Sequence, residues 1–350
     1  MSQLPMAGAP ANVNLVGLVK NDYRGNPTTL CAGCGHNSIS NQIISALYEL
    51  SVLPEDVLKF SGIGCSSKSP TYFMNRSFGF NSLHGRMPSI ATGGLFGDPT
   101  LKGVAVSGDG DTASIGMGQF KHIMRRNVNM VYIIENNGVY GLTKGQFSAT
   151  AERGLQLKKQ GTNPYMPIDL CMEAVISNAT FVARSFAGNP KQVKELIKAA
   201  YSHEGIAILD IISPCVTFNN NEDAHYSYPW GKDHESPLQD ITYVPPRSEI
   251  MLDEELKEGE IREVAMHDGS IIILKNLEKN YDPTNRFEAL RVLEEAQRDN
   301  LLITGLIYIA TDRPTLADTY QLVDTPLNRL TESDLRPAPA MLDKVNALMF

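Results

Sequence analysis

A short buried strand that ends in a glycine- and aspartate-rich turn constrains the fold of this chain most. Gly103-Val-Ala-Val-Ser107 has the continuous apolar character of a strand covered on both faces, and Gly108-Asp109-Gly110-Asp111 follows it. An amphipathic helix is expected from about Thr112 to Arg126, and Met130-Val-Tyr-Ile-Ile134 reads as the next strand. Because this is a βαβ unit, the sequence predicts an α/β fold with a mostly parallel sheet flanked by helices.

Helical and strand patterns alternate on both sides of this unit. Helices are expected over residues 37–50, 168–176, 190–201 and 286–298, and strands over 58–61, 180–183, 206–212 and 301–310. After Pro214 the pattern loosens into polar and proline-rich stretches. We therefore expect an N-terminal arm over residues 1–30, a main domain over 31–249 and a C-terminal extension over 250–350, with residues 311–350 wrapped on a neighbouring surface.

Composition excludes several classes of function. The 350 residues are 42% apolar, which is enough for one large core. A net charge of -8 argues against a nucleic-acid binder, whose affinity rests on clustered Lys and Arg. The N-terminus has no basic region followed by an apolar stretch, and the longest apolar run, Leu301 to Ala310, is too short to span a bilayer. We expect a cytoplasmic protein that binds small molecules or other proteins, with no nucleic-acid or membrane partner.

The turn after the first strand suits a diphosphate. Its glycines let the backbone approach phosphate oxygens, and the helix that follows points free N–H groups at the anion. Mg²⁺ prefers octahedral oxygen ligation, which Asp109, the Asn137 amide oxygen and the Val139 main-chain carbonyl could supply. Asp111 is a rival ligand, although its place just before the helix suits an N-cap. A lone Gly-Asp-Gly is ordinary turn chemistry, so the Asn136-Asn137 pair one βαβ interval later is the stronger signal.

Five cysteines in a chain without a secretory signal point to metal or cluster ligation rather than to disulfides. Four thiolates can hold either a structural zinc or an iron–sulfur cluster. A zinc ribbon would show a second close pair besides Cys31 and Cys34, and haem attachment would need His rather than Gly35 next. A redox pair of the thioredoxin kind would leave Cys65 and Cys215 unexplained, whereas an iron–sulfur cluster would use all four. Cys171 falls in an apolar helix and is expected in the core.

Several motifs together resemble one family. These are Cys31-Ala-Gly-Cys34-Gly-His36, Gly62-Ile-Gly-Cys65-Ser-Ser, Leu83-His84-Gly85-Arg86, the Gly108 turn and Asn136-Asn-Gly-Val-Tyr-Gly-Leu-Thr-Lys-Gly-Gln146. They look like the β subunit of 2-oxoacid:ferredoxin oxidoreductases, over roughly residues 20–220. The spacing from Gly108 to Asn137 also resembles the metal and diphosphate motif shared by thiamine-diphosphate enzymes.

The resemblance implies the cofactors and their ligands. Residues 31–249 would form the thiamine-diphosphate-binding domain, with Mg²⁺ on Asp109, Asn137 and the Val139 carbonyl, and a 4Fe–4S cluster on Cys31, Cys34, Cys65 and Cys215. The implied cofactor-binding residues are Gly64, Cys65, Gly108, Asp109, Gly110, Asp111, Asn137, Val139, Gly141, Leu142 and Thr143.

The family reaction is the coenzyme A-dependent oxidative decarboxylation of a 2-oxoacid, or its reverse, with electrons passed to ferredoxin. The glutamate that activates the aminopyrimidine has no match here, because in the family a different subunit carries it. The chain is therefore expected to be active only with an α subunit, with or without γ and δ parts, and with ferredoxin as the electron acceptor.

The expected substrate is 2-oxoglutarate, which would yield succinyl-CoA. Lys68 matches a lysine that pairs with the distal carboxylate in family members using this acid, and Leu142 matches a position that limits pocket size. A solvated surface lysine is the alternative for Lys68. His84 and Arg86 are expected to donate to diphosphate or substrate, and His36 to do likewise or to satisfy a buried carbonyl.

Three other functions stay open at this point. The same enzyme class could act on pyruvate or a branched-chain 2-oxoacid. A non-redox thiamine enzyme could hold a structural zinc on the cysteines, or the chain could carry a cluster without binding thiamine.

Overall fold

One large sheet organises the chain. The computed structural model describes residues 13–246, 248, 261–277 and 281–349. Within these residues, an eight-stranded sheet has the order β11-β15-β9-β10-β4-β3-β1-β2. Its strands are β1 (Val57–Ser61), β2 (Phe78–Asn81), β3 (Lys102–Gly108), β4 (Met130–Asn136), β9 (Phe181–Phe186), β10 (Ile206–Ile212), β11 (Glu235–Pro237) and β15 (Leu302–Ile309).

The sheet is mostly parallel, as the sequence predicts. The strands from β2 through β1, β3, β4 and β10 to β9 pair in parallel, and only β15 runs antiparallel to its neighbour β9. Every residue of β4 and of β10 is buried, since helices cover both faces of the sheet. The α/β fold class is therefore confirmed, and the carboxyl ends of β1, β3 and β4 meet at one edge.

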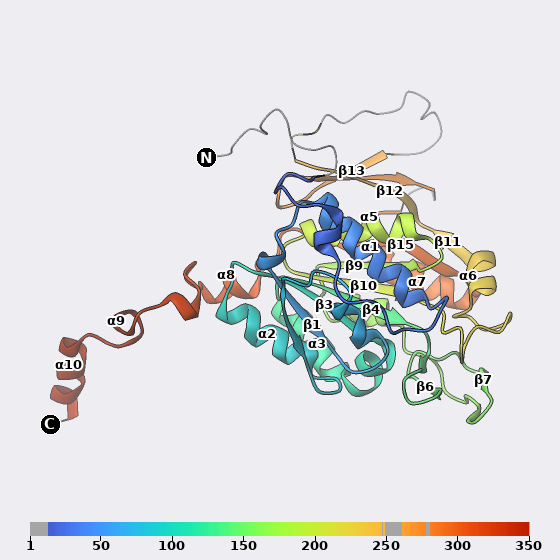
Figure 1. The fold of residues 1–350 in the computed structure, drawn as a ribbon, viewed down its shortest axis with the longest axis horizontal. Coiled ribbons are helices and arrows are strands. Elements are labelled where there is room, and N and C mark those ends of the chain that lie inside the picture. The colour runs from blue at the N-terminus through green and yellow to red at the C-terminus, as the bar shows by residue number, and fades with distance from the viewer. Residues whose placement is uncertain (1–12, 247, 249–260, 278–280, 350) are drawn as a thin grey trace.

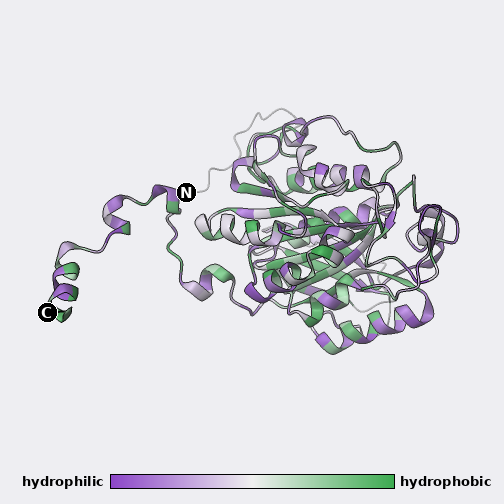
Figure 2. Ribbon diagram, turned by 90° about the horizontal axis from the view of Figure 1, so that it is seen from below, coloured by the Kyte–Doolittle hydropathy of each residue, from purple (hydrophilic) through white to green (hydrophobic). Residues whose placement is uncertain are grey.

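Helices form a layer on each face (Figure 1). One face carries α1 (Gly35–Glu49) and α5 (Pro190–Ser202), which pack against each other. The opposite face carries α2 (Met87–Gly97), α3 (Met117–Arg126), α4 (Leu170–Ile176) and α7 (Arg286–Asp299). Figure 2 shows apolar residues concentrated between the layers and polar residues on the outer sides of the helices. Each face thus has its own hydrophobic core.

The helix after β3 does not begin as an ordinary α-helix. Residues Gly110–Ile115 form a π-helical turn, η4, directly after Asp109, and α3 starts only at Met117. The expected helix from Thr112 is therefore present in two parts. Such wide turns occur often at functional sites, and this one presents backbone at the edge where the Gly108 turn lies.

The part of the chain after residue 249, expected to be an extension, contributes a strand to the main sheet. Helix α7 and strand β15 agree with the predicted helix and strand, but β15 lies in the main sheet beside β9. A second, antiparallel sheet of β12 (Gln239–Val244), β13 (Ile261–Ala265) and β14 (Ile271–Asn276) packs on the face of α5 and has no counterpart in the sequence prediction. Residues 250–260 lie outside the described residues.

The two ends of the chain differ from each other. Residues 1–12 of the expected N-terminal arm lie outside the described residues, whereas Tyr23 is fully buried and donates its hydroxyl to the Val52 carbonyl at 2.7 Å. At the other end, α9 (Glu332–Leu335) and α10 (Pro339–Met349) extend away from the body and bury no residue (Figure 1). Within the described residues, no helix is long and apolar enough to cross a membrane.

The remaining elements are short. They are η1 (Lys20–Tyr23), η2 (Pro54–Asp56), η3 (Ser66–Thr71), β5 (Val139–Tyr140), β6 (Gln146–Phe147), β7 (Gln156–Leu157), β8 (Gly161–Thr162), α6 (Tyr228–His234), α8 (Leu316–Tyr320) and η5 (Leu327–Arg329).

Candidate active site

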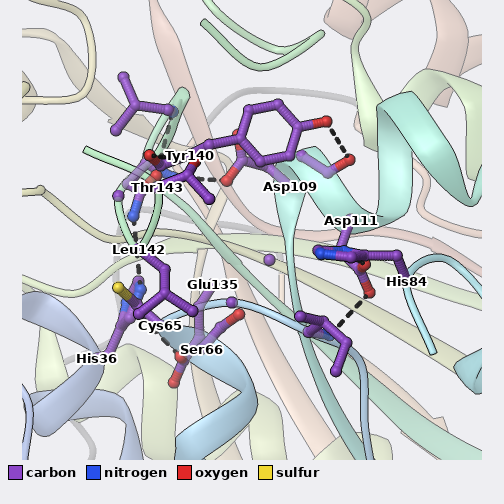
Figure 3. A pocket seen from close by; sticks show the side chains of 17 residues that line it. His36, Cys65, Ser66, His84, Asp109, Asp111, Glu135, Tyr140, Leu142 and Thr143 are labelled. Carbon is purple, nitrogen blue, oxygen red and sulfur yellow. Dashed lines mark hydrogen bonds and ion pairs between the residues drawn. The ribbon is translucent and has the colours of Figure 1, made fainter. Parts of the chain in front are cut away.

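A pocket lies at the carboxyl ends of β1, β3 and β4, where the loops after these strands converge (Figure 3). Every residue that the sequence named as cofactor-binding lines it. The full lining is His36, Ile63, Gly64, Cys65, Ser66, His84, Gly108, Asp109, Gly110, Asp111, Glu135, Asn137, Val139, Tyr140, Gly141, Leu142 and Thr143. The edge of a parallel sheet thus gathers residues that are more than 100 positions apart.

Asp109 is buried at the floor of this pocket. Its Oδ2 accepts hydrogen bonds from the hydroxyls of Ser148 and Thr150, the latter at 2.7 Å, and its Oδ1 accepts a longer bond of 3.3 Å from the Asn137 N–H. Burial raises the pKa of Asp109, and the two hydroxyls oppose this shift. One carboxylate oxygen therefore keeps the capacity to bind a cation.

Asn137 and Val139 stand next to Asp109, on the chain that leaves β4. The Asn137 Oδ1 accepts the Val139 N–H at 3.1 Å, and Asn219 holds the Asn137 carbonyl at 2.9 Å. The three expected Mg²⁺ ligands thus lie together at the pocket wall. Within the described residues, no group of three or more His, Cys, Asp or Glu side chains is arranged to hold a metal. The oxygen set is one carboxylate, one amide and one main-chain carbonyl, which are donors that Mg²⁺ accepts together with phosphate oxygens and water.

Asp111 is not the helix N-cap that its position suggested. Its Oδ1 accepts from the Gly85 N–H at 2.9 Å and meets His84 Nδ1 at 2.7 Å. Its Oδ2 accepts from the Ser107 hydroxyl at 2.9 Å and from the Ile63 N–H at 3.3 Å. Because the helical turn already begins at Gly110, Asp111 lies inside it rather than before it. Its carboxylate joins the loops after β1 and β2 to the end of β3.

Two glycines allow this close packing. A Cβ on Gly110 would lie 2.5 Å from the ring of Tyr140, whose hydroxyl donates to the Gly110 carbonyl at 2.9 Å. A Cβ on Gly62 would lie 2.0 Å from Asp111 Oδ2. Any side chain at either position would push apart the loops that shape the pocket.

A buried His–Glu pair closes the end of the pocket nearest to α1 (Figure 3). His36 Nδ1 lies 2.6 Å from the Ser213 hydroxyl and 3.6 Å from Glu135 Oε2. Burial lowers the pKa of His36 to about 4, so its ring is neutral at pH 7. Burial also raises the pKa of Glu135 well above its usual value, and the Ser69 hydroxyl bonds the carboxyl at 3.0 Å. His36 thus meets a side-chain hydroxyl rather than a backbone carbonyl.

Of the four cysteines expected to hold a cluster, Cys65 is part of the pocket wall. A Cβ added to Gly141 would lie 3.5 Å from the Cys65 sulfur and 3.8 Å from the Cys215 sulfur. Burial raises the pKa of Cys34 to about 12, with further contributions from Glu135, Cys215 and Cys65. Burial also raises the pKa of Cys65, and Cys31 contributes to this rise. Within the described residues, however, these thiols are not arranged as a metal-holding group. Cys171 is fully buried in α4, as expected.

Of the four residues expected to contact substrate, two line the pocket and two do not. Leu142 and His84 line the pocket mouth and are about half exposed, with 50% for the Leu142 residue and 47% for the His84 side chain. Lys68 and Arg86 do not line the pocket. Lys68 follows Cys65 in η3, and its charge counteracts the raised pKa of the Cys65 thiol. Arg86 is exposed at the start of α2.

Sequence reasoning missed several residues of the site. Ser66, Glu135 and Tyr140 line the pocket, and Ser148 and Thr150 hold Asp109 from behind. Glu135 directly precedes the Asn136-Asn137 pair and Tyr140 follows it within the same motif, so both could have been found by their position. The two hydroxyl residues follow β6, and only the hairpin of β5 and β6 returns them to Asp109.

Comparisons with known proteins agree with this geometry. The family described as "Thiamine pyrophosphate enzyme, C-terminal TPP binding domain" matches residues 62–211. A 2-oxoacid:ferredoxin oxidoreductase subunit beta from Sulfolobus is 45% identical over 194 residues, which cover 54% of this chain and 63% of that protein. A 2-oxoglutarate synthase subunit KorB from Methanocaldococcus jannaschii is 39% identical over 55% of this chain and 71% of its own length.

The match extends to a solved structure. A 2-oxoglutarate:ferredoxin oxidoreductase from Magnetococcus marinus, with 2-oxoglutarate, coenzyme A and succinyl-CoA bound, has a TM-score of 0.71 and 32% identity over 94% of this chain and 95% of that chain. The similarity to the Sulfolobus relative is confined to just under two thirds of that protein.

Proposed function

Because this chain belongs to the family of 2-oxoacid:ferredoxin oxidoreductase β subunits, we propose that it carries the thiamine diphosphate and the iron–sulfur cluster of such an enzyme. The reaction is the coenzyme A-dependent oxidative decarboxylation of 2-oxoglutarate to succinyl-CoA, or its reverse, with ferredoxin as the electron partner. A cytoplasmic location fits, since free cysteines suit a reducing compartment.

One observation carries this proposal: Cys65 lines the same pocket as Asp109 and Asn137. A thiamine enzyme without redox chemistry needs no thiol cluster at its cofactor. Here the loop after β1 brings the Cys65 sulfur to the wall of the diphosphate pocket, and the Cys215 sulfur lies beside the same Cβ position of Gly141. The arrangement favours an enzyme in which the thiazolium and a redox centre are neighbours.

The diphosphate end of the cofactor would be held by the turn after β3. Asp109, Asn137 and the Val139 carbonyl would ligate Mg²⁺, and the backbone of Gly108 and Gly110 would approach the phosphate oxygens. When bound, thiamine diphosphate supplies an electron sink for the decarboxylated carbon. Asp111 keeps the loops around this position in place through its four donors.

The cluster would be held by Cys31, Cys34, Cys65 and Cys215. Thiolates are the usual ligands of a 4Fe–4S centre, and these four come from the loop before α1, the loop after β1 and the loop after β10. Gly141 leaves the space beside two of the sulfurs free of a side chain. Four thiolates also suit zinc, so iron content decides between the two metals.

The pocket is incomplete without a partner. Its mouth is formed by the half-exposed Leu142 and His84, and in the described lining Glu135 is the only glutamate, held by Ser69. We propose that an α subunit covers the mouth and supplies the missing acid, with coenzyme A entering at the interface. Lys68 is proposed to meet the distal carboxylate of 2-oxoglutarate from η3.

The test is anaerobic co-expression with the α subunit. The complex should contain iron, sulfide and thiamine diphosphate, and should reduce ferredoxin only when both 2-oxoglutarate and coenzyme A are present. Pyruvate and branched-chain 2-oxoacids should be turned over more slowly. A colourless zinc protein, or 2-oxoacid cleavage without electron transfer, would contradict the proposal.

A further inference from the structure

We propose that Ser148 and Thr150 set the cation preference of the cofactor site by occupying one oxygen of Asp109. They are positioning residues, since they act on the metal through the carboxylate. This inference rests on the proposed function, and it adds two residues and a selectivity that the Mg²⁺ ligands alone do not explain.

Both hydroxyls converge on the same atom. Ser148 Oγ and Thr150 Oγ1 each donate to Asp109 Oδ2, the second at 2.7 Å, and the two hydroxyl oxygens lie 2.9 Å apart. The other oxygen, Oδ1, accepts a long bond of 3.3 Å from the Asn137 N–H. The carboxylate is therefore held more tightly at Oδ2 than at Oδ1.

The backbone fixes these hydroxyls. The Ser148 N–H donates to the Gly138 carbonyl at 3.1 Å, at the end of the β5–β6 hairpin. The Tyr226 hydroxyl donates to the Thr150 carbonyl at 2.7 Å. Ser148 and Thr150 are buried, with 6% and 1% of their surface exposed. Both side chains are thus enclosed beside Asp109, and the Thr150 hydroxyl has a second, more distant acceptor in Asn136 Oδ1 at 3.1 Å.

A carboxylate held in this way ligates through one oxygen. Mg²⁺ requires compact octahedral geometry and accepts a single carboxylate oxygen with waters and phosphates. Ca²⁺ takes six to eight oxygen ligands at longer distances and often binds a carboxylate through both oxygens. Since Oδ2 is already bonded to two hydroxyls, the site disfavours Ca²⁺ without any direct contact between those hydroxyls and the metal.

The experiment measures the preference rather than activity. The αβ complex is stripped of cation and cofactor with a chelator, and thiamine diphosphate is titrated back with Mg²⁺, Mn²⁺ or Ca²⁺ while bound thiamine is assayed. The wild type should bind more tightly with Mg²⁺ than with Ca²⁺. In Ser148→Ala/Thr150→Val this ratio should move toward Ca²⁺ by about tenfold, the size expected for losing charge-assisted hydrogen bonds.

Three further variants separate the positioning of the carboxylate from general damage to the loop. Thr150→Ser keeps the hydroxyl and should retain the wild-type ratio, whereas Thr150→Val alone should move it partway if the double variant does not fold. Ser114→Ala is the matched control. The Ser114 hydroxyl accepts the N–H of Ala149, the residue between Ser148 and Thr150, at 3.1 Å, but it makes no hydrogen bond to Asp109 among the described residues. Its cation ratio should be unchanged.

The possible results distinguish a failure of the proposed function from a failure of the role proposed for Ser148 and Thr150. If the wild type binds thiamine diphosphate with none of the cations, the proposed function fails and this inference falls with it. If the wild type binds normally and Thr150→Val keeps the wild-type ratio, the proposed function stands and the role of the hydroxyls is overturned. An equal shift in Ser114→Ala would also overturn it, because loop anchoring alone would then explain the change.

Discussion

Two buried aspartates, two positions apart, have different environments. On Asp109, Oδ2 accepts two hydroxyls and Oδ1 accepts a long bond from the Asn137 N–H, whereas Asp111 has two donors on each oxygen. A metal at Asp111 would have to displace bonds that hold three loops together. The environment of each carboxylate, more than its place in the motif, supports Asp109 as the ligand.

Replacing Asp109 with Ala should abolish retention of thiamine diphosphate, because Mg²⁺ would keep only neutral protein oxygens. The measurement is bound thiamine per complex after gel filtration in Mg²⁺. Asp111→Asn should instead lower thermal stability while retaining some cofactor. Full occupancy in Asp109→Ala would transfer the ligand role to Asp111.

Each of the four clustered cysteines should be required for iron. Single Ala substitutions at Cys31, Cys34, Cys65 and Cys215 should lower the iron content of the complex, while Cys171→Ala should leave it unchanged, since that thiol is enclosed in the core. Iron and sulfide analysis of anaerobically purified protein tests this. Iron that survives loss of Cys215 but not of Cys171 would refute the ligand assignment.

Lys68→Ala should impair 2-oxoglutarate use far more than pyruvate use, because only the former has a distal carboxylate. A charge-assisted contact contributes on the order of 1.5–3 kcal/mol, so kcat/KM for 2-oxoglutarate should fall by roughly ten- to a hundredfold. Paired steady-state kinetics with a reducible acceptor measure both acids. Equal losses would instead assign Lys68 to the cysteine loop, where its charge acts on Cys65.

At the scale of elements, hydrophobic periodicity in the sequence correctly predicted the long helices and the buried strands. Helix α1, helix α5 and strands β3, β4 and β10 lie within a few residues of their predicted positions, because each is long and strongly patterned. The sheet of β12, β13 and β14 was missed, although the burial of β12 alternates, since its short strands lie among polar and proline-rich stretches.

The residues of the site also fall into two groups: those in recognisable sequence motifs and those that only the tertiary fold brings into place. Glycines, cysteines and the aspartate turn have restrictive chemistry at fixed spacing, so the sequence predicted a role for them, and the glycines of the aspartate turn, Asp109 and Cys65 do line the pocket. Ser148 and Thr150 are common residues whose role depends on a hairpin bringing them back to Asp109. The predicted N-cap role of Asp111 was wrong, because the helical turn begins earlier, at Gly110, and places Asp111 inside its first turn.

Strands β9 and β10 are joined to α4 by a buried ion pair network. Arg184 donates to Asp169 at 2.8 Å and to Asp210 at 3.0 Å, and Asp210 in turn accepts from Asn136 at 2.9 Å. Arg184→Ala would leave two carboxylates in the interior without their cation. The free energy of unfolding should fall by about 3–5 kcal/mol.

Chemical denaturation of the complex, followed by far-ultraviolet circular dichroism, measures this loss. Arg298→Ala is the control, because its pairing with Asp299 lies at the surface and should not affect the midpoint. A loss below about 1 kcal/mol in Arg184→Ala would mean that the network adds little to the fold.

At the scale of the whole molecule, the hydrophobic cores that stabilise the fold and the pocket that carries the candidate site lie in different parts of the sheet. The two hydrophobic cores lie on opposite faces of the sheet, while the site occupies its carboxyl edge, where loops meet. The pocket mouth is open, and the C-terminal helices α9 and α10 extend from the body with Leu342, Val345 and Leu348 exposed (Figure 1). These features suit a subunit that works within a larger assembly.

The most direct test of the account is a single turnover of the anaerobic complex. Adding 2-oxoglutarate and coenzyme A without ferredoxin should bleach the visible absorption of the cluster and produce the paramagnetic signal of a reduced 4Fe–4S centre. Asp109→Ala, which should lack the cofactor, should give no bleaching although its iron is intact. A wild-type complex with full thiamine diphosphate and iron whose cluster stays oxidised on adding both substrates would contradict the claim that the two sites work together.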